Sequence, residues 1–165
     1  MVHTLHAAGL KPDDFKKFTE HYASALTEMM LKEKFGKFDI NEIEKIDGQP
    51  VYHQRVDVPI PFVDPRSMLI KAYALPLENG HIFFLSSKDT VNLVDKYKTR
   101  LGKDVVGTLN INFWRFLVSE DGQGTDITHI MCMNPNGKMP DFAVGKMTSA
   151  QAKGALNVID LVKSK

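Results

Sequence analysis

The longest uninterrupted helical pattern lies at the C-terminal end of the sequence, and it constrains the fold more than any other stretch. Asn136-Gly137 is a turn signal, and Pro140 suits a first helical turn, where a missing N–H leaves no helical hydrogen bond unmade. No proline follows, so the pattern predicts one helix from about Pro140 to about Val162. Apolar residues recur along it at three- and four-residue steps and share one face: Ala143, Met147, Ala150, Gly154, Val158 and Leu161.

This helical face is apolar but is built largely from small side chains. Gly154 costs a helix about 1 kcal/mol relative to alanine, and a helix that only fills a core normally carries larger residues. Two interpretations remain open at this point. The face packs tightly against a sheet, or it lies close to something else.

The rest of the sequence predicts a short strand, a second helix and a run of hairpins. Residues 2–8 form the strand, and a helix with an aromatic stripe, predicted to be core, begins at Pro12 and ends near Gly36. Asp47-Gly48 and Asn79-Gly80 are hairpin turns. Residues 40–46 suit a strand or a helix, and residues 89–100 suit a short helix or a polar loop. The other expected strands are 51–58, 68–77, 81–86, 105–118 and 125–133.

Consecutive hairpins make a sheet antiparallel. The sequence therefore predicts one α+β domain over residues 1–165, in which a curved antiparallel sheet wraps around the long C-terminal helix. Within the strand 105–118, alternation places Leu109, Ile111 and Phe113 on one face. Arg115 continues that face unless a bulge intervenes.

Segment 59–65 is expected to be a loop, because its three prolines cannot donate hydrogen bonds to a central strand. The segment is apolar for a loop. Its side chains Ile60, Phe62 and Val63 either pack down as a lid or stay exposed.

Composition matters here mainly for what it excludes. A hydrophobic content of 43% and a charged content of 25% are ordinary for a soluble globular domain, and a net charge of +1 gives no general field that would recruit nucleic acid. No apolar run approaches the roughly 20 residues of a membrane span, and the N-terminal residues lack the pattern of a secretory signal. Cys132 is the single cysteine, so we expect no internal disulfide, a buried thiol and a cytoplasmic location.

No established catalytic motif is present. The sequence has no phosphate-binding glycine loop, zinc-protease helix, serine-hydrolase elbow or cysteine pair. His3 and His6 are three positions apart, so on a strand they point to opposite faces and cannot chelate one metal. We therefore expect no metal, no cofactor and no catalysis. A basic cluster suits a solvated face or contact with anionic lipid headgroups: Lys88, Lys96, Lys98, Arg100 and Lys103.

Two stretches resemble the START domain, the steroidogenic-acute-regulatory-related lipid-transfer family with the helix-grip fold. Residues 44–52, the apolar 59–62 loop and the segment Asp64-Pro65-Arg66-Ser67-Met68 resemble that family's hairpin, proline-containing loop and Pro-Arg-Asp-Phe-like strand entry. Residues 133–140, Met-Asn-Pro-Asn-Gly-Lys-Met-Pro, resemble its last strand, its Gly-x-Leu-Pro-like turn and the start of its C-terminal helix. The resemblance covers most of residues 10–163.

The chain also departs from the family pattern. Family members usually begin with a helix and two further strands before the strand that residues 2–8 match, so the chain resembles a START domain shortened at its N-terminus. Ser67-Met68 replaces the usual acidic-aromatic pair. The buried acid and arginine of some sterol-binding members would fall near His53 and Ala72, which disfavours cholesterol as the ligand.

The resemblance implies an apolar tunnel between the curved sheet and the C-terminal helix, lined in part by adaptable methionines and entered through a gate that touches a membrane. The implied ligand-binding residues are Met68, Phe113, Arg115, Met131, Met133, Ala143, Met147, Ala150, Gly154 and Val158. The implied membrane gate consists of Ile60, Phe62, Val63 and Met139.

The implied function is non-catalytic binding and intracellular transfer of a hydrophobic lipid such as a phospholipid or a sterol. The expected partners are that lipid and, transiently, a membrane surface, without nucleic acid, and we expect a monomer rather than an edge-paired dimer. Two alternatives stay open. One is an enzyme like the cyclases and hydrolases among helix-grip proteins, with His53, Arg115 or His129 facing the cavity. The other is a protein-interaction module that uses its sheet edge.

Overall fold

The computed structural model of the protein describes residues 1–34, 36–57 and 59–164. Within these residues one sheet contains the strands β1 (Val2–Ala8), β2 (Lys37–Ile46), β3 (Gln49–Asp57), β4 (Arg66–Leu77), β5 (Gly80–Ser86), β6 (Val105–Val106), β7 (Thr108–Val118) and β8 (Gly124–Asn134). The strands lie in the order β1-β8-β7-β5-β4-β3-β2, and all of these neighbours pair antiparallel. The short strand β6 pairs parallel with β4.

The helical segments interrupt this meander at three places along the chain. The first group precedes β2, the second lies between β5 and β6, and the long helix follows β8. They are η1 (Pro12–Phe15), α1 (Lys16–Glu20), α2 (Tyr22–Glu33), η2 (Lys88–Thr90), α3 (Leu93–Lys96), α4 (Lys98–Leu101) and α5 (Asp141–Lys163).

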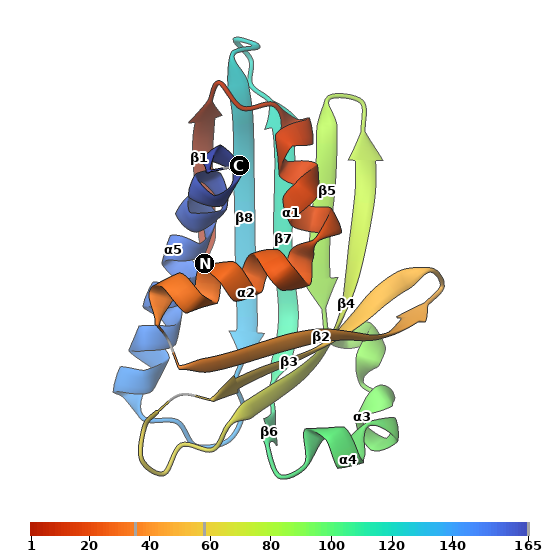
Figure 1. The fold of residues 1–165 in the computed structure, drawn as a ribbon, viewed down its shortest axis with the longest axis vertical. Coiled ribbons are helices and arrows are strands. Elements are labelled where there is room, and N and C mark those ends of the chain that lie inside the picture. Colours follow the sequence, from red (N-terminus) through yellow and green to blue (C-terminus); the bar gives the residue numbers. More distant parts are fainter. Residues whose placement is uncertain (35, 58, 165) are drawn as a thin grey trace.

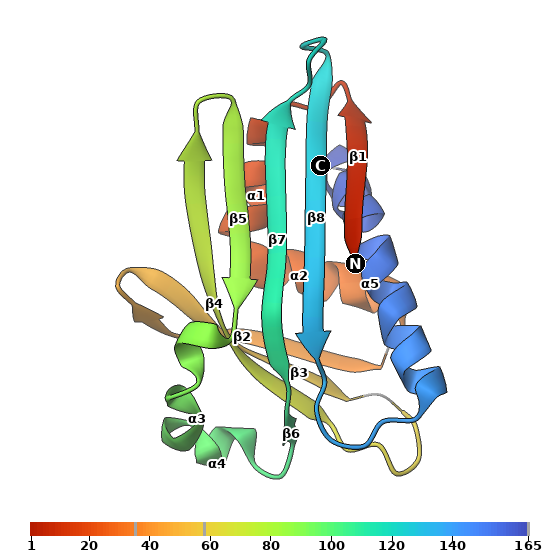
Figure 2. The same cartoon turned by 180° about the vertical axis from the view of Figure 1, so that it is seen from behind.

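Helices α1, α2 and α5 all lie on one face of the sheet (Figure 1). Helix α5 runs beside β1 and contacts α2, which in turn crosses the sheet and contacts β2. Strands β2 and β3 turn away from the upright strands and close the lower end of this face. Seen from behind, β5, β7 and β8 have no helix in front of them (Figure 2). The predicted α+β class, with an antiparallel sheet and a long C-terminal helix, is confirmed.

The long helix follows the predicted pattern closely. Pro140 is its N-cap, with extended torsion angles, and the helix continues to Lys163 without a break. All six residues of the predicted apolar face are buried or half-buried, whereas Phe142 and Leu156 on the other side are exposed.

The predicted helix from Pro12 to Gly36 is in fact three segments, and the prediction of one helix was wrong. His21 has torsion angles of φ −117° and ψ 38°, which end α1 and let α2 leave in a new direction. The apolar spacing still runs through both helices, because α1 and α2 each bury their apolar face against the sheet. Its aromatic stripe is core, as expected: Phe18 packs edge-on against Phe83 and Trp114, with ring centroids 6.2 and 5.4 Å apart.

The structure decides the two segments whose secondary structure the sequence left open. Residues 40–46 belong to β2, which forms a ladder with β3, and residues 89–100 form short helices. The strand predicted over residues 51–58 matches β3 as far as Asp57, and Val58 lies outside the described residues.

Cys132 is exposed and not buried, so the expectation of a buried thiol was wrong. Alternation along β8 turns its side chain to the face of the sheet without helices, where the Asn110 amide donates to its sulfur at 3.5 Å.

The two hairpin signals have different outcomes. Asp47 and Gly48 both have positive φ, 52° and 76°, as a two-residue turn of the mirror-image type requires. The second turn is displaced by one residue from the prediction, because Gly80 already pairs with Leu77 and opens β5. Gly80 is required by a close approach: a Cβ there would lie 1.9 Å from the carbonyl oxygen of Phe116 on β7.

Gly80→Ala is therefore expected to destabilise the protein. Overpacking costs about 1–3 kcal/mol, and a collision with a backbone carbonyl puts this variant at the upper end of that range. The measurement is the free energy of unfolding in urea. Gly145→Ala is the control, since a Cβ at Gly145 meets nothing within 4 Å and alanine favours a helix by up to about 1 kcal/mol. Equal stability of the two variants would contradict the close approach of β5 and β7.

Candidate functional site

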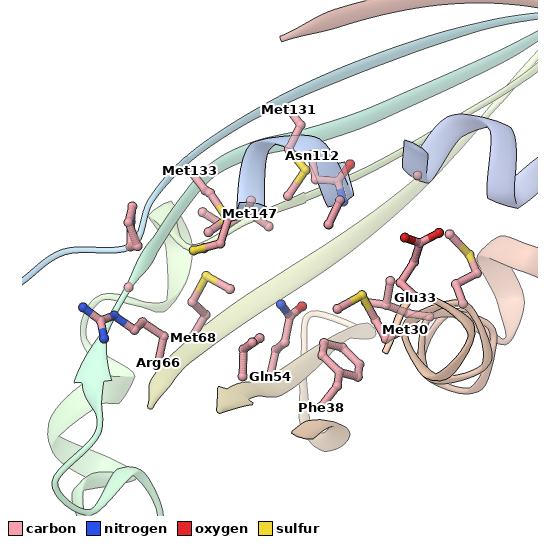
Figure 3. A pocket seen from close by; sticks show the side chains of 18 of the residues that line it. Met30, Glu33, Phe38, Gln54, Arg66, Met68, Asn112, Met131, Met133 and Met147 are labelled. Carbon is pink, nitrogen blue, oxygen red and sulfur yellow. The ribbon is translucent and has the colours of Figure 1, made fainter. Parts of the chain in front are cut away.

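A cavity of about 130 Å³ lies between the sheet, α2 and α5 (Figure 3). Its wall is mostly apolar. The lining residues come from both ends of the chain: Phe18, Tyr22, Leu26, Met29, Met30, Glu33, Phe38, Gln54, Val56, Arg66, Met68, Gly107, Leu109, Asn112, Trp114, His129, Met131, Met133, Pro135, Met139, Met147, Ala150, Gly154 and Asn157.

Methionine dominates this lining. Seven of the eight methionines of the chain take part, and they come from α2, β4, β8, the loop before α5 and α5 itself. Met131 and Met133 both face the cavity because they are two positions apart on one strand. The unbranched, polarisable thioether side chain adapts to irregular shapes, so this wall can fit ligands of more than one shape.

Six of the ten predicted ligand-binding residues line the cavity: Met68, Met131, Met133, Met147, Ala150 and Gly154. From the predicted gate, Met139 also lines it. Ala143 and Val158 lie on the same helical face and are buried, but they do not line the cavity.

Phe113 and Arg115 do not line the cavity, and the expectation for them is corrected. The register between β7 and β8 shifts between Leu109 and Ile111, which marks a β-bulge. The bulge exchanges the two faces, so that Asn112 and Trp114 point inward instead. Arg115 is exposed and donates to the Thr128 hydroxyl at 3.1 Å.

The surroundings of Gly154 decide between the two interpretations of the small-residue face of α5, tight packing against the sheet or proximity to something else. A Cβ built there meets no atom within 4 Å, so the glycine does not serve a tight contact with the sheet. The space beside it belongs to the cavity. The small residues of α5 therefore leave room where a larger face would have filled the core.

The loop over residues 59–65 combines buried and exposed apolar side chains. Phe62 is completely exposed at 103% of its reference area and has a positive φ of 64°, which is unfavourable for a bulky residue. Val63 is buried and its N–H donates to the Ile60 carbonyl at 3.2 Å. Ile60 is half-buried.

Arg66 connects this loop to the segment that leads into α5. Its guanidinium donates to the carbonyl oxygens of Asp64, of Asn136 at 3.3 Å and of Lys138 at 3.1 Å. Arg66 is 96% buried, and no carboxylate lies within ion-pair distance of it in the part of the chain that the structure describes. It therefore holds two loops together at the end of the cavity next to Met68 (Figure 3).

A neutral polar cluster forms part of the inner wall, and of its members the sequence analysis named only His129 as facing the cavity. His129 Nε2 is 3.0 Å from Asn112 Oδ1, and the Trp114 ring stacks on His129 with centroids 3.8 Å apart. Burial lowers the pKa of His129 to about 4, with a further contribution from His3. His129 is thus neutral at pH 7 and donates from Nε2. His129 faces inward by the same alternation as the methionines of β8, and the sequence had marked it as a side chain that could face the cavity. Only the bulge brings Asn112 and Trp114 to the inner face, so no local sequence signal marks those two.

A second polar cluster, on the other side of β3 and β4, has the residue types of a serine hydrolase but the wrong hydrogen-bond directions. Arg100 Nε donates to His53 Nδ1 at 3.0 Å, so His53 must donate from Nε2 to the Ser67 hydroxyl, 3.0 Å away. Ser67 in turn donates to Asp104 at 2.7 Å, and Arg55 donates to the same carboxylate. His53 therefore has no free lone pair with which to take a proton from Ser67. The cluster attaches the α3–α4 segment to the sheet.

The described residues contain neither a cluster of metal-ligating side chains nor a helix that could span a membrane. No group of three or more histidine, cysteine, aspartate or glutamate side chains could hold a metal ion there. None of the helices that the structure describes is long and apolar enough to cross a membrane.

The cavity beneath a long C-terminal helix, held against an open antiparallel sheet, defines the helix-grip class. No family profile matches the sequence, and no curated protein matches it as a relative. Solved structures do match the fold. Human STARD10 superimposes with a TM-score of 0.66 at 15% identity over 98% of this chain and 62% of that one. Human StAR-related lipid transfer protein 5 gives 0.64 at 11% identity over 99% and 74%.

The chain thus has the fold of START-related lipid transfer domains, and it spans less than two thirds of the STARD10 chain. The Zhui aromatase/cyclase from Streptomyces sp. R1128 matches with a TM-score of 0.50 at 13% identity, over 98% of this chain and 89% of that one. At these identities the comparisons establish the fold and not the ligand.

The neutral state of His129 makes stability depend on pH. The pKa of His129 is lower in the folded protein than in the unfolded chain, so below about pH 6.5 the unfolded chain takes up a proton that the folded protein does not. The free energy of unfolding should therefore fall between pH 6.5 and pH 4, by about 3 kcal/mol from this residue. Burial also lowers the pKa of His53 and His81, which adds to the fall.

Urea denaturation at pH 7 and pH 4.5 of the wild type and of His129→Phe isolates this contribution, because phenylalanine keeps a ring against Trp114 but has no ionisable group. The variant should lose about 2–3 kcal/mol less than the wild type over that interval. The same loss in both proteins would show that His129 is not held neutral.

Proposed function

We propose that the protein binds a hydrophobic, lipid-like ligand in the cavity beneath α5 and carries it between membranes without catalysis. The observation that supports this most is the methionine-rich cavity wall beside the open space at Gly154. Each CH₂ group removed from water contributes about 0.8 kcal/mol, so a single acyl chain provides useful affinity. The fold of the START-related neighbours agrees with this role.

The cavity is too small to hold a whole lipid without a change in the structure. At about 130 Å³ it matches an engineered cavity of about 150 Å³ that holds one benzene molecule, and it is smaller than the roughly 300–1,000 Å³ of ordinary ligand sites. An acyl chain or a sterol therefore requires α5 and the methionines to move outward. We propose that the described arrangement is the closed, unloaded form.

We propose that the ligand enters between residues 59–65 and the start of α5. Phe62 on the loop and Phe142 on the first turn of α5 are both exposed aromatic residues, and exposed apolar side chains of this kind favour a bilayer interface. Moving these segments apart would break the hydrogen bonds that Arg66 makes to both of them. Arg66 would thus limit opening.

We propose a non-catalytic role because neither polar cluster offers an activated nucleophile. Of the three side chains considered for catalysis, only His129 lines the cavity; it has no carboxylate partner in the described residues and donates to Asn112. We also propose a monomer, since the exposed edge strand β1 has only seven residues and short edges resist pairing. A cytoplasmic location agrees with the single, exposed Cys132.

Gly154→Trp should fill the cavity and reduce ligand binding by at least about tenfold while the protein remains folded, since a lost hydrophobic contact of 1.4 kcal/mol gives this factor. Native mass spectrometry after incubation with mixed lipid vesicles measures the loaded fraction. Leu156→Trp on the exposed face of the same helix is the matched control and should load like the wild type. A folded Gly154→Trp protein that loads normally would place the ligand elsewhere.

Phe62→Ser should slow lipid transfer between vesicles about fivefold or more but leave equilibrium binding unchanged, because the side chain touches no part of the cavity wall. A fluorescent-lipid exchange assay gives the rate, and the loaded fraction gives the affinity. Val91→Ser removes another exposed apolar side chain, 69% accessible, and should change neither quantity. Equal effects of the two variants would argue against a specific gate.

A further inference from the structure

The face of the sheet without helices is more apolar than the solvated face of an antiparallel sheet normally is (Figure 2). The strands β4, β5, β7, β8 and β1 are consecutive in the sheet, and alternation turns every second residue of each to this face. Their register aligns one apolar residue per strand in a single row across the sheet: Tyr73, Phe84, Phe113, Ile130 and Val2. With strands about 4.8 Å apart, the row is about 20 Å long.

Further apolar side chains adjoin this row on the same face. Leu75 and Leu77 of β4 are 50% and 40% exposed, and Ile82 and Leu117 are half-buried. We call the row and these four residues the outer apolar face. Figure 2 shows no helix in front of β5, β7 or β8, so no described helix covers its middle. A contiguous exposed apolar patch of this kind marks an interaction site.

One unpaired charge lies within the outer apolar face. Arg115 is exposed and lies on β7, the middle one of the five strands, two positions from Phe113. It donates to the Thr128 hydroxyl at 3.1 Å, and no carboxylate of the described residues lies within ion-pair distance of it. Other charges at the margin are paired, since Asp126 lies 2.9 Å from the His6 imidazole. The face therefore presents a positive charge beside its aromatic row.

We propose that the outer apolar face binds an amphipathic helix of a partner protein, which lays its apolar residues along the row and presents a carboxylate to Arg115. Aromatic residues beside an arginine at the centre of a patch are typical of the residues that supply most of the binding energy in interfaces. Helix α2 crosses the opposite face of the same sheet in this way (Figure 1). The inference goes beyond the proposed function, because the cavity lies on that opposite side.

A second copy of the chain and a bilayer both fit this face less well. Two copies that overlay their middle strands about a two-fold axis would bring the two Arg115 side chains together, and like charges across an interface repel. Insertion into a bilayer needs apolar side chains that project from the surface, as Phe62 does. The aromatic residues of the row are half-buried against one another, with Tyr73 and Phe84 stacked at 4.6 Å between ring centroids.

Two dye-labelled helical peptides of about 18 residues, long enough to span the row, test this inference on the whole protein. Both carry leucines at three- and four-residue steps on one face and alanines and glutamines elsewhere. One has a single glutamate beside the leucines, and the other has a lysine in its place. Fluorescence anisotropy should show that the wild type binds the glutamate peptide at least about tenfold more tightly than the lysine peptide. Arg115→Glu should reverse this preference.

Phe113→Ser should weaken both peptides about tenfold or more, because it removes the middle of the row. Leu75→Ser, at a more exposed position, should weaken them in the same direction and serves if Phe113→Ser does not fold. Leu156→Ser removes an exposed leucine of α5 on the other side of the sheet and is the matched control, which should bind as the wild type does.

Three results would overturn the inference. The first is a wild type that binds neither peptide or both equally, and the second is an Arg115→Glu protein that keeps the wild-type preference. The third is a different occupant of the face. Self-association at micromolar concentration that Phe113→Ser abolishes would assign the face to a second copy, and binding to phosphatidylcholine vesicles that Phe113→Ser abolishes would assign it to a bilayer.

Discussion

The structure depends on a mismatch between α5 and the sheet that it covers. The helix closes one side of a curved sheet, but its inward face carries alanine and glycine at positions where leucine or phenylalanine would normally complete a core. The methionines of α2, β4 and β8 then surround a space that they do not fill. Protein interiors are ordinarily packed as densely as organic crystals. A helix that leaves such a space at Gly154 sacrifices packing energy, which a ligand bound there, as proposed, would restore.

Two attachments hold α5 over that space. Near its beginning, Arg66 donates to the carbonyl oxygens of Asn136 and Lys138 in the segment that leads into the helix. Further along, Lys153 and Asn157 contact Glu33 on α2. Beyond them Val158 and Leu161 are fully packed. The C-terminal half of α5 is thus anchored by core contacts, while the segment that leads into its N-terminal half is attached by the hydrogen bonds of Arg66.

The polar residues on the two sides of the sheet have different surroundings. The charged network of Arg55, Arg100 and Asp104 lies on the side of α3 and α4, where it is partly hydrated and attaches those helices. The cavity side carries two charged side chains in the described residues: Arg66, surrounded by carbonyl oxygens, and Glu33, paired with a lysine of α5. The other polar groups of its lining are neutral, and burial keeps the histidine uncharged. An apolar wall takes up amides and a neutral imidazole at lower cost than a charge, and a buried charge there depends on hydrogen bonds such as those of Arg66 to carbonyl oxygens.

The sequence by itself determined the elements whose signals are local. Turn chemistry at Asp47-Gly48, the three prolines of residues 59–65 and the uninterrupted periodicity of residues 141–163 each act over a few residues, and the fold class followed from their order. Six of the ten proposed lining residues could be predicted because they lie on a regular helix or on a strand with unbroken alternation.

Only the tertiary structure decided the features that depend on pairing. The bulge between Leu109 and Ile111 reverses the faces of β7, which removes Phe113 and Arg115 from the cavity and brings in Asn112 and Trp114. The close approach of Gly80 to Phe116 likewise involves a partner far away in the sequence. Register and side-chain partnership are set by the neighbouring strand or helix, and no local pattern of residues contains them.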